Sequence, residues 1–194
     1  MDRSSWTAPA ALVVGGVLSA VLFVPFTLAH GPTSYKVENE VLGADMHGWG
    51  FAMGTVPYLL IGAGVWRLRP RISGDRRTAS TALAVACAAM FLFAAMNLAF
   101  RAIGPPFDLM LLAPAMVVAA LTSPGRGPVR ALLAALALTY CVALVIALVP
   151  QSTSDDYAGY RVFGAVAYAG VGLLWAALGT WLLRSAEGLA LATE

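Results

Sequence analysis

Long apolar runs alternate with short polar connectors along the whole chain. Most of the runs reach about the 20 residues that an α-helix needs to cross a hydrocarbon core roughly 30 Å thick. The connectors cannot lie in lipid, because their backbone groups would have no hydrogen-bond partners there. The pattern predicts an all-α polytopic transmembrane bundle of six helices, at about residues 8–28, 48–68, 80–100, 107–122, 129–149 and 162–183.

The stretch from Tyr35 to Trp49 is the most polar connector, and it fixes where the first run ends and the second begins. Another connector contains Pro105 and Pro106, which prevent the third helix from continuing. A cleavable signal peptide is the alternative for residues 8–28, although this run is longer than the usual core of about 7–15 residues.

The composition supports one membrane domain that covers residues 1–194. Hydrophobic residues make up 60% of the chain and charged residues 11%, against roughly 45–50% and about 25% in soluble domains. The sequence contains no basic run interleaved with aromatic residues, so nucleic acid is not expected as a partner. Cys87 and Cys141 each fall inside an apolar run, where a thiol behaves as a small hydrophobic side chain.

The distribution of basic residues predicts the orientation, since short loops rich in Lys and Arg stay cytoplasmic. With the N-terminus inside, the outer side receives only Lys36, Arg101 and Arg161. We therefore expect a multi-pass protein of the cell (inner) membrane with both termini in the cytoplasm. The inner side receives Arg3, Arg67, Arg69, Arg71, Arg76, Arg77, Arg126, Arg130 and Arg184.

Polar and aromatic residues gather toward the predicted outer ends of three helices. Helical spacing places them on one face of each helix. If these faces converge, they form an outward-opening aromatic pocket beneath a carboxylate-rich rim. The candidate substrate-binding residues are Trp49, Phe51, Thr55, Tyr58, Phe93, Asn97, Arg161, Tyr168 and Trp175.

Asp45, Asp108 and Arg101 are the candidate catalytic residues at the mouth of this pocket. An acid-catalysed site needs one protonated carboxyl and one ionised carboxyl in separate environments. Asp108 begins a helix, where the dipole favours a negative charge, so we assign it the ionised role and Asp45 the acid role. The alternative is structural, with Arg101 pairing to Asp108 across the tight turn.

Several common chemistries have no support in the sequence. His30 and His47 stand at opposite ends of one connector, a poor arrangement for a metal, and we predict neither a metal nor a cofactor. The acids are expected only at the outer rim, and no ionisable group is expected near the middle of a span. Proton-driven carriers need such groups, so this class is disfavoured.

Four short stretches carry a resemblance to known proteins: DMHGWG at residues 45–50, WRLR at 66–69, YRVFG at 160–164 and WLLR at 181–184. In these stretches and in span layout the chain resembles small bacterial six-helix membrane proteins classed as a domain of unknown function. The resemblance implies the fold and leaves the chemistry open. The chain is also similar in size and helix number to integral-membrane terpene cyclases, which rely on acids at or within the helices.

Three function classes remain open at this stage. The first is a membrane protein that binds or converts a lipid-like or other amphiphilic small molecule in the aromatic pocket, by acid catalysis in the manner of terpene cyclases. An aromatic wall with a polar mouth suits such a ligand. The second is a substrate-binding subunit of a transporter. The third is a non-catalytic accessory subunit, and a homo-oligomer or a larger membrane complex is compatible with each class.

Overall fold

The computed structural model describes residues 4–30, 40–100, 107–124, 127–148 and 158–191. Its elements are α1 (Ser4–His30), α2 (Met46–Ser73), α3 (Arg77–Phe100), α4 (Phe107–Thr122), α5 (Pro128–Leu148), α6 (Ala158–Gly164), the π-helix η1 (Ala165–Gly170) and α7 (Val171–Leu191). The last three follow one another without a break and form one rod. No strand occurs among the described residues, so the all-α prediction is confirmed for them.

Five stretches are long and apolar enough to cross a membrane by length and composition. Each of the six predicted spans falls on one helical rod, to within a residue at its ends. The helix at Asp108–Thr122 is apolar but shorter than the others. The five long stretches are Trp6–Ala29, His47–Ser73, Arg77–Phe100, Pro128–Leu148 and Arg161–Ser185.

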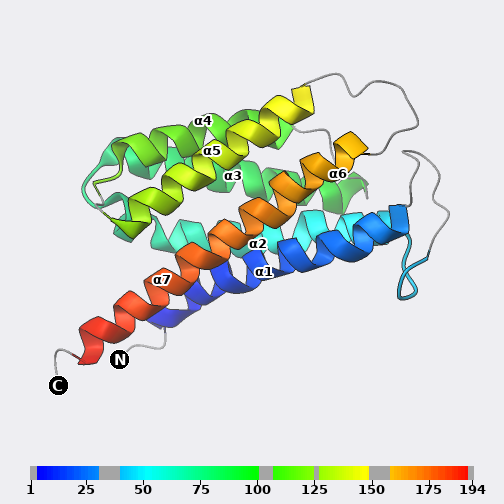
Figure 1. The fold of residues 1–194 in the computed structure, drawn as a ribbon. Coiled ribbons are helices and arrows are strands. Elements are labelled where there is room, and N and C mark those ends of the chain that lie inside the picture. The colour runs from blue at the N-terminus through cyan, green and yellow to red at the C-terminus, as the bar shows by residue number, and fades with distance from the viewer. Residues whose placement is uncertain (1–3, 31–39, 101–106, 125–126, 149–157, 192–194) are drawn as a thin grey trace.

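The rods pack as a closed ring in which consecutive helices run in opposite directions (Figure 1). Each helix from α1 to α5 contacts the next, α5 contacts α7, and α7 returns to α1. The start of α1, the end of α7 and the α2–α3 and α4–α5 turns therefore lie at one end of the molecule. We call it the arginine end, because the described residues there include Arg67, Arg71, Arg76, Arg77, Arg130 and Arg184.

Helix α1 fits between α2 and α7 because glycines face it from both sides. A Cβ atom on Gly64 would stand 2.9 Å from the Ala8 carbonyl oxygen, and one on Gly179 would stand 2.7 Å from that of Pro9. A Cβ on Gly16 would collide with the Gly172 carbonyl. Such small residues let helix backbones approach closely, as they do in helix pairs within lipid.

The π-helix η1 shifts the backbone hydrogen-bond ladder between α6 and α7. Its Tyr168 carbonyl accepts a hydrogen bond from the Ser19 hydroxyl of α1 at 2.9 Å. This bond gives the Tyr168 carbonyl a partner on the neighbouring helix, and it links α1 to η1 where the two pack together. Single-turn π segments often mark functional sites.

The surface of the rods is largely aliphatic. On α1, exposed aliphatic side chains recur every three or four residues and form an outward stripe, while Leu12 and Phe26 point into the core. Such a surface would be costly in water and suits hydrocarbon. The stripe consists of Val14, Val17, Val21, Val24 and Leu28.

Candidate functional site

Asp108 is the described acid that reaches furthest between the helices. It lies in the first turn of α4, and its Oδ2 accepts a hydrogen bond from the Tyr58 hydroxyl at 3.4 Å. Tyr58 is buried near the midpoint of α2, about 18 Å along the axis from the start of that helix. The expectation that acids stand only at a rim does not hold for Asp108, because the short α4 begins at the depth of Tyr58.

Asn97 of α3 contacts Gly54, one turn before Tyr58 on α2, and has no hydrogen-bond partner among the described residues. Its side chain is fully buried, and neither the amide nitrogen nor the amide oxygen is bonded. Gly54 makes room for it, since a Cβ at Gly54 would collide with the Asn97 nitrogen. Thr55, the next residue on α2, is also buried with an unpartnered hydroxyl. We call Thr55, Tyr58, Asn97 and Asp108 the polar cluster.

Phe93 fixes the geometry of this cluster from the α3 side. Its ring centroid is 4.6 Å from that of Tyr58, with the two planes tilted by 43°. Asn97 follows one turn later on α3 and packs against Gly54, which precedes Tyr58 by one turn on α2. Two matched turns of antiparallel helices therefore hold the aromatic pair and the amide side by side, as the sequence spacing of these faces suggested.

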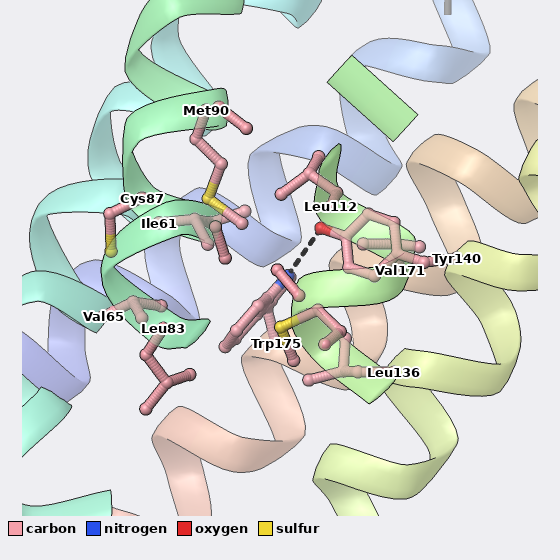
Figure 2. Close-up of a cluster of buried hydrophobic side chains, with 14 of the residues drawn as sticks. Ile61, Val65, Leu83, Cys87, Met90, Leu112, Leu136, Tyr140, Val171 and Trp175 are labelled. Carbon is pink, nitrogen blue, oxygen red and sulfur yellow. Dashed lines mark hydrogen bonds between the residues drawn. The ribbon is translucent and has the colours of Figure 1, made fainter. Parts of the chain in front are cut away.

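Two further tyrosines extend the polar interior toward α5 and η1. Tyr140 and Tyr168 lie close enough to Tyr58 to act on it electrostatically. The Tyr140 hydroxyl accepts a hydrogen bond from Trp175 Nε1 at 3.1 Å, which Figure 2 shows within a shell of aliphatic side chains. Tyr140 could not be selected from sequence, because a lone tyrosine within an apolar run has no distinguishing spacing.

The remaining predicted pocket residues fill the interior or lie at its edge. Trp175 and Tyr168 are buried, and the Tyr168 ring lies between those of Phe23 and Phe163. Phe51 is half-buried one turn before Thr55, and Arg161 is exposed on α6. The Tyr168 ring thus packs against two other aromatic rings.

Asp45 has a structural role that separates it from the polar cluster. It is the N-cap of α2, and its Oδ1 accepts a hydrogen bond from the Gly48 N–H at 2.8 Å. A capping carboxylate satisfies one of the orphan N–H groups at a helix start. Tyr58 lies about 20 Å further along the α2 axis, too far for Asp45 and Asp108 to act on one group.

Trp49 and Arg101 complete the predicted set. The Trp49 indole donates a hydrogen bond to the Val41 carbonyl at 2.9 Å, and so ties the turn before α2 to the helix. That turn includes Leu42 and Gly43, both with positive φ. Arg101 lies outside the described residues. Within the described part of the chain, no three His, Cys, Asp or Glu side chains group to hold a metal.

Comparisons of the chain with protein-family models, with curated proteins and with solved structures found no match. Within the described residues, the polar cluster on α2, α3 and α4 combines a carboxyl bonded to a phenol with a buried amide and a buried hydroxyl that have no hydrogen-bond partner.

Proposed function

We propose that the protein is an integral membrane protein that binds an amphiphilic small molecule through the polar cluster. The membrane setting is supported by the five long apolar stretches and by the aliphatic outer surface of α1. With α4 as a shorter sixth crossing, both termini would be cytoplasmic. The concentration of arginines at one end of the rods supports this orientation, because basic loops stay inside.

The unpartnered Asn97 amide is the observation that carries the binding proposal. Burying an amide without a hydrogen bond costs about 1–3 kcal/mol in proteins, so such groups are rare and require an explanation. Asn97 is fully buried, and Thr55, the residue after the Gly54 that Asn97 contacts, is also buried without a partner among the described residues. A ligand that hydrogen-bonds to both residues would supply the missing partners.

Asp108 adds the second reason to place function here. An ionisable side chain among membrane-spanning helices is expensive and usually marks a functional site. Its bond to Tyr58 is 3.4 Å long, whereas strong bonds between oxygens measure about 2.5–3.0 Å. A ligand hydroxyl or amine that replaced this weak contact would therefore lose little.

Conversion of the ligand by acid catalysis is a narrower form of the proposal. It assigns the acid role to Asp108, since Asp45 caps α2 outside the polar cluster. Tyr58 would hold the carboxyl in position before the ligand enters. Asp108→Asn keeps the shape of the side chain but removes its acidity, so this form predicts that the variant loses turnover even at ligand concentrations high enough to overcome its weaker binding.

Copurification tests the binding proposal. The native protein, Asn97→Leu and Asp108→Asn are extracted in mild detergent, and bound small molecules are quantified by mass spectrometry. We expect one amphiphile with the native protein, reduced about tenfold or more in both variants, since each lost hydrogen bond to a buried group costs roughly 1–3 kcal/mol.

Two variants serve as matched controls. Ser123→Ala removes another buried hydroxyl that has no partner, and Asp75→Asn removes an exposed carboxyl in the α2–α3 turn. Both lie at the arginine end and should retain the molecule at the native level. Native amounts of the same molecule in Asn97→Leu and Asp108→Asn, or a water-soluble molecule in its place, would refute the proposal.

A further inference from the structure

A second site lies at the other end of α3, in a groove between α3 and α4. The groove has a volume of about 530 Å³, within the roughly 300–1,000 Å³ typical of small-molecule sites. Its floor is formed by Ala82 and Ala115, both buried. Its walls are the exposed apolar side chains Val85, Leu111, Pro114 and Val118.

The groove is apolar along most of its length and polar at one end. That end is lined by Arg77, Thr78 and Thr81, all exposed. Arg77 is also the first residue of α3, where unpaired backbone N–H groups and the helix dipole favour an anion. Arg71 and Arg76 at the same end add positive charge around the single nearby acid of the α2–α3 turn, Asp75.

We propose that this groove binds one phospholipid with an anionic headgroup. The headgroup phosphate lies on Arg77 and the two threonine hydroxyls, and an acyl chain lies over the alanine floor toward Leu111. A guanidinium forms paired hydrogen bonds to phosphate oxygens. Alanines in the floor leave the space that larger side chains would fill, so the shape suits a chain rather than a compact solute.

The charge around the groove favours an anionic lipid over a zwitterionic one. Basic residues near a membrane surface attract acidic lipids, and several arginines share this end. Phosphatidylcholine carries a compensating cation beside its phosphate, which these arginines would repel. The selectivity therefore follows from the local charge and not from the apolar walls.

This inference rests on the membrane placement given under the proposed function, and it is independent of the polar cluster. Asn97 and Arg77 belong to the same helix and lie about 30 Å apart along its axis. If no ligand bound at Asn97, the proposal for the groove would still stand. If the protein did not fractionate with membranes at all, both proposals would fail together, and that fractionation is measured first.

Native mass spectrometry tests the groove with two defined lipids. The protein in detergent is titrated with dioleoyl phosphatidylglycerol or with dioleoyl phosphatidylcholine, and the affinity of the first bound molecule is measured. We expect preference for phosphatidylglycerol, and a loss of about tenfold in Arg77→Gln, since a hydrogen bond to a charged group is worth roughly 1.5–3 kcal/mol.

Arg76→Gln is the matched control, because it removes the same charge from the adjacent exposed residue, which does not line the groove. It should retain most of the phosphatidylglycerol affinity. Ala115→Leu fills the floor without changing charge and should weaken the binding of the same lipid. Arg77→Gln remains informative whatever the folding of Ala115→Leu, because Arg77 is exposed.

Three results would overturn the inference. The first is equal affinity for the two lipids in the native protein. The second is an equal loss in Arg76→Gln and Arg77→Gln, which would indicate diffuse attraction to the whole arginine end. The third is displacement of phosphatidylglycerol by inorganic phosphate at the same concentration, which would identify a site for a soluble anion instead.

Discussion

At the scale of single residues, the protein keeps polar groups where aliphatic ones would pack at least as well. Thr55 is buried with a free hydroxyl, whereas Thr139 of α5 donates its hydroxyl to the Ala135 carbonyl at 2.8 Å. The two threonines therefore differ in their hydrogen bonding although both lie in apolar helices. The proposed ligand site would account for the Thr55 hydroxyl, whereas the backbone already satisfies that of Thr139.

Thr55→Val should raise the free energy of unfolding of the ligand-free protein by about 1 kcal/mol, because a methyl group of similar size replaces a buried hydroxyl without a partner. The same change should weaken binding of the copurified amphiphile. Thr139→Val is the matched control and should leave both quantities nearly unchanged. The free energy of unfolding is measured by denaturation in detergent, followed by tryptophan fluorescence. A clear loss of stability in Thr55→Val would contradict this account of the cluster.

At the scale of helices, close approach across glycines holds α1 in the ring. A Cβ on Gly172 would stand 2.9 Å from the Ser19 Cβ and would also press on the Gly16 carbonyl of α1. A Cβ on Gly170, one residue before α7, would make only ordinary van der Waals contacts, the nearest at 3.4 Å from the Ala165 carbonyl oxygen. Two glycines of one continuous rod thus have opposite tolerance for a side chain.

Gly172→Ala should destabilise the protein by about 1–3 kcal/mol, since an added methyl group in a packed interface forces the backbones apart. Gly170→Ala should be neutral or slightly stabilising, because alanine favours the helix more than glycine does. Comparison of the two melting temperatures in one detergent measures the difference. Equal effects from the two substitutions would show that the α1–α7 interface does not depend on this contact.

The helices were predictable from sequence because each apolar run is long and ends at prolines, glycines or charges. The convergence of Thr55, Tyr58, Phe93 and Asn97 followed from helical spacing. The depth of Asp108 did not, because the register between α2 and α4 depends on packing through α3 rather than on local sequence. The capping role of Asp45 could not be told from sequence either, since an aspartate just before a helix can serve as an N-cap or as a catalytic acid.

At the scale of the whole molecule, the ring of helices places the two candidate sites in opposite halves. The polar cluster lies on α2, α3 and α4 near the middle of α2, and the groove between α3 and α4 lies near the arginine end. The membrane orientation decides which leaflet each site faces. With the arginine end in the cytoplasm, the groove meets the inner leaflet.

Cysteine labelling in intact cells is the most direct measurement of this orientation. Glu40→Cys and Asp75→Cys place thiols at exposed positions at opposite ends of α2, and the native protein gives the background, since Cys87 is buried and Cys141 is partly buried within α5. A membrane-impermeant maleimide should label Glu40→Cys in intact cells and Asp75→Cys only after the cells are permeabilised. Labelling of Asp75→Cys from outside would contradict the orientation, and with it the placement of the groove in the inner leaflet.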